Sequence, residues 1–168
     1  DPMKTPIVFS NGSLARVKSA LAAHGLDTTI KEFSASTRTS AEAAAAIGCT
    51  VAQIAKSLIF MARETHRPIL VLASGINRVD EKKLTAVVGE EVRKPDAAWV
   101  RDQTGFAIGG VAPVGHLKPP LVLIDQDLLT LDPIWAAAGQ PNAVFCLTAK
   151  ELVLITGGRV IDLAQRPE

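Results

Sequence analysis

Apolar and polar positions along the chain switch repeatedly between the spacing of helices and the spacing of strands. Apolar residues three and four apart, followed by helix-ending residues, predict helices over 13–25, 39–48, 79–89, 94–105, 132–139 and 149–158. Alternating or continuously apolar runs predict strands over 28–33, 56–62, 68–74, 120–125, 142–148 and 159–164. Because the order is not a strict strand–helix repetition, we predict one α/β domain with a mixed sheet.

Several predicted helices have recognisable end residues. Hydroxyl and carboxylate side chains accept hydrogen bonds from the free N–H groups of a first turn, and glycine readily ends a helix. Thr39 and Thr50 are each followed three residues later by Glu42 or Gln53, which is the spacing of a capping box. Ser13, Thr39, Thr50 and Asp80 are the expected capping residues, Pro95 is expected at or near the first position of its helix, and the expected helix-ending residues are Gly25, Gly48, Gly89 and Gly105.

One lysine stands at the start of an apolar strand, in the segment QIAKSLIFMA of residues 53–62. Strand periodicity places Lys56 on the same face as Leu58 and Phe60. A buried ammonium without a partner is costly, so it must either reach back to water or face a negative group. Lys56 is therefore a candidate binding residue, with a solvent-exposed strand end as the competing explanation.

The segment TGFAIGGVAPVGHLKPP, residues 104–120, fits neither spacing and holds four glycines and three prolines. Glycine lets the backbone approach a ligand closely, and proline keeps a loop rigid. Such a loop can direct backbone N–H groups at a bound group. It can equally be a tight connection between a helix and the strand predicted at 120–125.

Composition and charge restrict the function classes. The chain has 168 residues, of which 48% are hydrophobic, enough for a sizeable core. Its 18 Lys and Arg residues against 17 Asp and Glu residues argue against a protein that coats long nucleic acid, but allow docking of a short single-stranded end. No apolar run approaches the roughly 20 residues of a membrane span. Without a signal peptide at DPMKTP, the expected location is the cytoplasm; Met3 is interpreted as the native start and residues 1–2 as a remnant of expression.

Familiar catalytic motifs are missing from the sequence. Cys49 and Cys146 form no C-x-x-C pair, and we expect Cys146 in the core. His24, His66 and His116 are scattered, and there is no P-loop, no G-x-G-x-x-G, no H-E-x-x-H and no G-x-S-x-G. The sequence therefore predicts no metal site, no cofactor and no covalent nucleophile.

Three segments together resemble the YbaK/ProX family. They are IAKSLIF with Lys56, LVLASGINRVDEKKL over 70–84, and the Gly-x-x-x-Pro of GGVAP followed by VGH over 109–116. Members of this family are bacterial editing domains, free-standing or inserted in prolyl-tRNA synthetases, that hydrolyse wrongly charged aminoacyl-tRNA. The resemblance covers about residues 25–165. It implies a YbaK-like α/β (α+β) domain over 3–168, with a mostly antiparallel sheet surrounded by helices.

The resemblance implies a metal-free, cofactor-free deacylase in which the ribose hydroxyl of the substrate assists proton transfer. Backbone N–H groups of the loop would hold the ester carbonyl oxygen as it becomes an oxyanion. Lys56 would contact the phosphate of the terminal nucleotide, or, as second choice, the developing oxyanion. The implied catalytic residues are Lys56, Gly109, Gly110 and Val111, and the implied substrate-binding residues are Ala112, Pro113, His116, Ser74, Gly75 and Asn77.

The implied substrate is the acceptor end of a mischarged tRNA. Proline tRNA carrying Ala, Ser or Thr is favoured over proline tRNA carrying Cys. Prolyl-tRNA synthetase is the candidate protein partner. No membrane contact is expected, and the oligomeric state stays open. One rival function is a non-catalytic module that binds the aminoacylated end, and another is a metal-free hydrolase of a different small ester or amide. Hydrolysis of a charged tRNA would exclude the binding module. A rate of hydrolysis that does not depend on the tRNA part of the substrate would favour the hydrolase of a different ester or amide.

Overall fold

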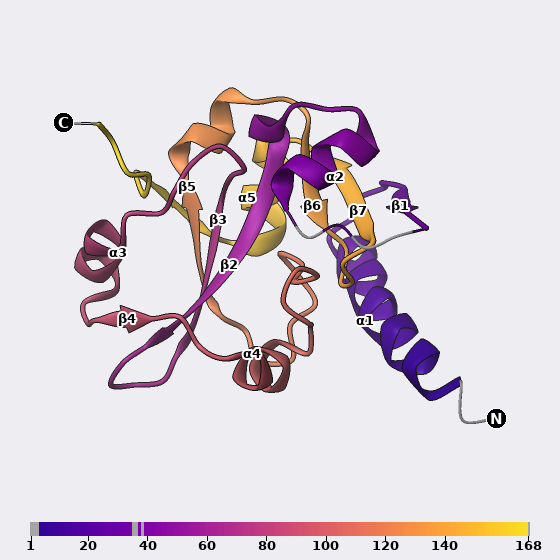
Figure 1. Cartoon of the computed structure of the whole chain (residues 1–168), viewed down its shortest axis with the longest axis horizontal. Helices are drawn as coiled ribbons and strands as arrows, with labels where there is room; N and C mark the ends of the chain where they lie inside the picture. Colours follow the sequence, from indigo (N-terminus) through magenta and orange to yellow (C-terminus); the bar gives the residue numbers. More distant parts are fainter. Residues whose placement is uncertain (1–3, 35–36, 38, 168) are drawn as a thin grey trace.

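The computed structural model describes the backbone of residues 4–34, 37 and 39–167, with side chains from residue 12 onward, so the expected start at Met3 lies outside it. One sheet runs through the domain (Figure 1). Its strands are β1 (Ile30–Glu32), β2 (Ile54–Ala62), β3 (Pro68–Ser74), β4 (Val92–Arg93), β5 (Leu121–Asp125), β6 (Ile134–Ala137), β7 (Ala143–Leu147) and β8 (Arg159–Ile161).

The strand order is β1-β7-β6-β2-β3-β5-β8, with β4 also paired to β2. The pairs β1–β7, β2–β3, β2–β4 and β6–β7 are antiparallel, and the pairs β2–β6, β3–β5 and β5–β8 are parallel. The prediction of a single α/β domain with a mixed, mostly antiparallel sheet is confirmed. The predicted hairpin of β2 and β3 is also present, joined by the polar segment 63–67.

The helices surround this sheet (Figure 1). They are α1 (Lys4–Ala23), α2 (Ser40–Ile47), α3 (Glu81–Val88), α4 (Ala97–Thr104) and α5 (Ala149–Thr156), with 3-10 turns at Val51–Gln53 and Gln126–Thr130. Both predicted capping boxes, Thr39 with Glu42 and Thr50 with Gln53, are formed. No described helix has the length and apolar character needed to cross a membrane.

Some local predictions differ from the structure. Ser13 lies inside α1 rather than at its start, and its hydroxyl donates to the carbonyl of Gly105 at 3.3 Å. Pro95 lies near the start of α4 as expected, directly before Asp96, whose carboxylate caps the helix by accepting from the N–H of Trp99.

The predicted helix over 132–139 is wrong, because the chain forms strand β6 there instead. Alanine favours helices, so pairing with β7 and β2 decides the outcome over intrinsic propensity. Cys146, expected in the core, is only half-buried in β7 opposite Trp135.

Apolar side chains fill both faces of the sheet. One face packs against α1, α5 and the glycine-rich loop, with a core that includes Val17, Leu72, Val111, Phe145 and Leu152. The other face packs against α3 and the C-terminal segment, with a core that includes Phe60, Val71, Leu84, Leu123 and Leu163. The buried strands β2 and β3 are therefore held rigidly on both sides.

The pairing of β2 leaves a gap in the sheet. On the side away from β3, β2 pairs with β6 only at Ile54 and Ala55, and with β4 only at Met61 and Ala62. No described strand pairs with residues 56–60 on this side. The loop between α4 and β5 lies beside this gap (Figure 1).

Candidate active site

A cavity of about 360 Å³ occupies the gap between β2 and β6. Its walls come from β2, the glycine-rich loop, the start of α2, and strands β6 and β7. The structure therefore brings Lys56 together with Gly109 and Val111, as expected from the sequence. The lining residues are Thr37, Thr39, Ser40, Ala43, Ile54, Ala55, Lys56, Ser57, Leu58, Ile108, Gly109, Val111, Trp135, Ala136, Ala137, Pro141, Ala143 and Val144.

The ammonium of Lys56 is held by the main chain. Its Nζ donates a hydrogen bond to the backbone carbonyl of Asn77, in the turn after β3. The side chain is half-buried, and burial, with a smaller contribution from Arg78, lowers the pKa of Lys56 below its ordinary value of 10.5. An ammonium has three donors, so one carbonyl leaves capacity for an anion. Lys56 is thus a desolvated cation beside a cavity.

The backbone N–H groups of the Gly-x-x-x-Pro loop differ in whether they already donate a hydrogen bond within the protein. The N–H of Gly110 donates to the carbonyl of Ala107 at 2.9 Å, which corrects the expectation that Gly110 offers a free donor. Among the described residues, the N–H groups of Gly109 and Val111 have no acceptor. Both residues line the cavity, so these two N–H groups are the candidate donors for a bound oxygen.

The family model described as "Aminoacyl-tRNA editing domain" matches residues 34–154, a range that contains β2 and the whole glycine-rich loop. The chain belongs to this family. The resemblance to the YbaK/ProX editing domains that we drew from Lys56 and the GGVAP loop is confirmed by this match.

Individual relatives of the editing domain agree with this assignment. The uncharacterized protein YwhH of Bacillus subtilis (strain 168) is 35% identical over 140 residues, which cover 83% of this chain and 88% of YwhH. A structure described as "a putative trans-editing enzyme for prolyl tRNA synthetase" is 46% identical, with a TM-score of 0.86 over 92% of this chain and 98% of that one. The proline–tRNA ligase of Limosilactobacillus fermentum (strain NBRC 3956 / LMG 18251) is 32% identical over 91 residues, 52% of this chain and 16% of the ligase.

His116 of the editing domain lies within the glycine-rich loop and hydrogen-bonds to its backbone. Its Nε2 lies 2.6 Å from the carbonyl oxygen of Ala112, so Nε2 carries the proton and donates it. Its ring meets Phe106 edge-on at 5.1 Å, and its Nδ1 is buried without a partner among the described residues. Burial, followed by Arg16, lowers the pKa of His116, and the Ala112 hydrogen bond opposes this. His116 does not line the cavity.

This environment predicts a pH-dependent stability. The folded chain binds a proton on His116 less readily than the unfolded chain, so we expect the free energy of unfolding to fall as pH drops below about 6.5. Urea unfolding of His116→Gln at several pH values should show a weaker dependence on pH. Replacing the exposed His24 by Gln is the matched control and should leave the dependence unchanged. Equal pH dependence in wild type and His116→Gln would contradict the prediction.

The turn after β3 holds the sheet together and stays outside the cavity walls. The buried Ser74 donates from its hydroxyl to the carbonyl of Ala52 at 2.7 Å. Gly75 lies so close to the preceding turn that a Cβ would be 2.4 Å from the carbonyl oxygen of Val51. Asn77 contacts Lys56 rather than the cavity. Ala112 and Pro113 are buried in the loop and do not line the cavity either.

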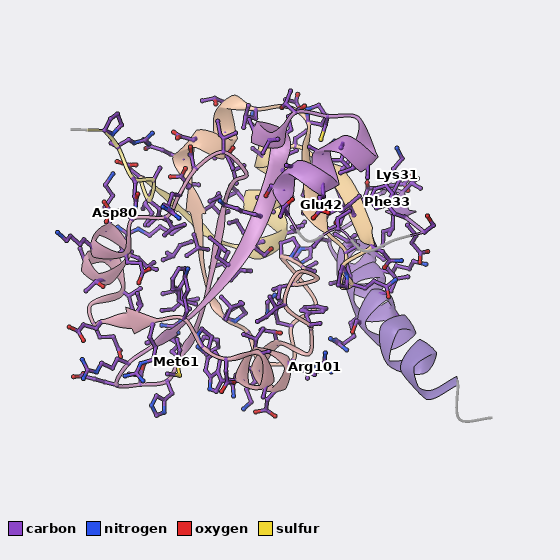
Figure 2. All side chains as sticks on the ribbon, in the orientation of Figure 1. Lys31, Phe33, Glu42, Met61, Asp80 and Arg101 are labelled. Carbon is purple, nitrogen blue, oxygen red and sulfur yellow. The ribbon has the colours of Figure 1, made fainter. Side chains whose placement is uncertain are left out.

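Sequence reasoning missed most of the residues that line the cavity, among them Ser57 and Trp135. Ser57, directly after Lys56, has a buried Oγ without a partner among the described residues. Trp135 lies in the segment that was wrongly predicted to be a helix. The ammonium of Lys31 lies 5.5 Å from the centroid of its ring. Lys31, which is labelled in Figure 2, lies on β1 and pairs with Val144 of β7. Nothing in the sequence distinguishes Ser57, and the Ile-Trp-Ala-Ala segment that contains Trp135 has no clear strand alternation.

The polar groups at the cavity include Lys56 and the hydroxyls of Thr37, Thr39, Ser40 and Ser57. Among the described residues, no group of three or more His, Cys, Asp or Glu side chains is arranged to hold a metal ion. The two cysteines are free, and burial raises the pKa of both thiols. The chemistry available at the cavity is therefore a cation, backbone donors and small hydroxyls.

Proposed function

We propose that this editing domain is a deacylase that acts in trans, hydrolysing the ester bond of mischarged aminoacyl-tRNA. The observation that carries the proposal is the cavity that joins the ammonium-bearing Lys56 to the N–H groups of Gly109 and Val111. The family, and the relatives described as acting for prolyl-tRNA synthetase or as proline–tRNA ligase, support proline tRNA as the carrier.

In the proposed reaction, the ester carbonyl oxygen lies against the loop and the acceptor end passes Lys56. A water molecule adds to the carbonyl carbon, and the N–H groups of Gly109 and Val111 stabilise the oxyanion that forms. One such donor is worth roughly 2.7–4 kcal/mol in measured enzymes. The ester C–O bond then breaks, the ribose oxygen takes up the proton that the attacking water loses, and a free amino acid and an uncharged tRNA result.

Lys56 is proposed to bind the phosphate of the terminal nucleotide. Its compact, half-buried ammonium keeps unused donors, and a phosphate oxygen would compensate for the burial that lowers its pKa. Help to the oxyanion is the second role that the same position permits.

The amino acid carried by the proposed substrate is a small one. Much of the cavity wall is alanine, including Ala43, Ala55, Ala136 and Ala143. Because the GGVAPVGH loop resembles that of family members that clear small residues, we propose alanyl, seryl or threonyl esters on proline tRNA, with cysteinyl esters less favoured. A methyl group or hydroxyl changes discrimination by only about 10- to 200-fold in an apolar pocket, so more than one of these esters is expected to react.

A deacylation assay tests the proposal. Purified protein is mixed with Ala, Ser, Thr, Cys and Pro esters of proline tRNA, and with correctly charged alanine, serine and threonine tRNAs. We expect hydrolysis of at least one mispaired ester, with Pro esters of proline tRNA spared. Binding without hydrolysis across the panel would establish the non-catalytic module instead, and equal hydrolysis of esters lacking tRNA would establish a general esterase.

A further inference from the structure

Asn77 uses nearly all of its polar groups inside the protein. Its backbone N–H donates to the carbonyl of Ser74 at 2.9 Å, and its backbone carbonyl accepts from the ammonium of Lys56. Its side-chain amide donates to one carboxylate oxygen of Asp125 at 3.0 Å and to one of Asp127 at 2.7 Å. Only the amide oxygen remains for any further partner.

The two carboxylates that anchor Asn77 are themselves fixed. Asp125 at the end of β5 is fully buried, and its other oxygen accepts from the N–H of Leu163 at 2.9 Å. Asp127 receives two hydrogen bonds from Arg166, at 3.0 and 3.2 Å. The amide of Asn77 is therefore held by the core of the sheet on one side and by an ion pair on the other.

An asparagine is the side chain that this position requires. Its amide supplies two N–H donors to two carboxylates, whereas aspartate would add a third negative charge and serine would supply one donor. The turn does not need asparagine for its backbone, because His66 is the one described non-glycine residue with positive φ. The presence of asparagine at position 77 is therefore explained by the two hydrogen bonds that its side-chain amide donates to Asp125 and Asp127.

We propose that Asn77 is a positioning residue that aims the ammonium of Lys56 at the cavity, rather than a residue that binds substrate. Asp125 and Asp127 fix the amide, the amide fixes the turn, and the carbonyl of the turn fixes the ammonium. This inference rests on the proposed function only for its activity readout, since the contact between Asn77 and Lys56 can be measured in the free protein.

A double-mutant cycle tests the proposal in single-turnover deacylation, with the uncatalysed rate subtracted. Asn77→Ala keeps the carbonyl but removes its anchor, so we expect about a tenfold loss of rate in the wild-type background. In a Lys56→Ala background the same replacement should change the rate less than about twofold. A tenfold loss in both backgrounds would overturn the proposal, because it would mean that Asn77 acts independently of Lys56.

A second readout needs no turnover. The Nζ signal of Lys56 in a lysine-selective ¹H–¹⁵N NMR spectrum should be visible in the wild type and broadened beyond detection in Asn77→Ala. A signal that persists in Asn77→Ala would overturn the proposal. If wild type hydrolyses none of the esters, the proposed function fails, and this spectrum still decides whether Asn77 positions Lys56.

Two further variants keep the test interpretable. If Asn77→Ala does not fold, Asp127→Ala removes one of the two amide anchors and should lower the rate in the same Lys56-dependent way. Asp162→Asn removes a partner of Arg166 at the far end of the network and leaves the contacts of Asn77 in place. The rate of Asp162→Asn should stay within about twofold of wild type; a tenfold loss would show that the activity follows the network as a whole and contradict a specific role for Asn77.

Discussion

Replacing Lys56 by methionine is expected to lower kcat/KM for deacylation by about 10- to 140-fold. A hydrogen bond to a charged group contributes about 1.5–3 kcal/mol, and each 1.4 kcal/mol corresponds to a factor of ten. Methionine keeps an unbranched side chain along β2 and removes only the ammonium. Because that ammonium is half-buried and its pKa is lowered, we expect the free energy of unfolding to change by less than about 1 kcal/mol.

The matched control for this variant is Lys82→Met. Lys82 is an exposed lysine of α3 outside the cavity, so its replacement removes the same charge without touching the site. Its kcat/KM should stay close to wild type, apart from a small salt-dependent effect on tRNA attraction. A normal rate for Lys56→Met would remove Lys56 from the mechanism, and an equal loss for Lys82→Met would show that only overall charge matters.

The lysine-dependent part of the rate should also depend on pH in a defined direction. Burial and Arg78 lower the pKa of Lys56, so the ammonium loses its proton at a lower pH than the ordinary 10.5. We therefore expect the difference between wild type and Lys56→Met to shrink as pH rises toward that value, after subtraction of the uncatalysed rate. A difference that grows with pH would mean that the neutral amine is the active form.

The local elements of the fold were predictable where short-range chemistry decides them. Each capping box joins residues three positions apart and the β2–β3 hairpin joins two strands that follow directly along the chain, and all three are formed. Strand β6 was missed because its Ile-Trp-Ala-Ala sequence lacks a clear alternation and is rich in alanine, which favours helices. Its parallel pairing with β2 joins Ile54 to Trp135 and Ala55 to Ala136, and pairing over such a separation leaves no local signal.

The site was predictable in part for the same reason. Lys56 stood out because a lysine in an apolar strand needs an explanation, and the loop stood out because its glycines and prolines fit no regular element. The partner of Lys56 did not stand out, because it is the backbone carbonyl of Asn77 and carries no side-chain signature. His116 matched the family pattern and was expected to bind substrate. In the structure its ring hydrogen-bonds to the carbonyl of Ala112 within the loop.

The second large effect is expected for Gly109→Ala. Gly109 has φ +91 and open space where a Cβ would lie, so alanine meets no clash but must adopt or relax a left-handed backbone. That conformation costs about 1–2 kcal/mol for a residue with a Cβ. Relaxation would turn the N–H of Gly109 away from the oxyanion, and losing one such donor lowers kcat by about 10²- to 10³-fold. Activity should therefore fall far more than stability.

Two other glycines separate this expectation from a general weakening of the fold. Gly89→Ala is the matched control: Gly89 ends α3 with φ +87, has equally open space and lies outside the cavity, so the same backbone cost should leave activity near wild type. Gly110→Ala should instead lower stability and activity together, because its Cβ would lie 2.7 Å from the backbone of Gln140. Thermal unfolding and single-turnover rates of the three variants show whether each replacement lowers stability, activity or both. If Gly109→Ala resembles Gly89→Ala, the loop does not supply the oxyanion donor, and if it resembles Gly110→Ala, the loop acts mainly in holding the fold.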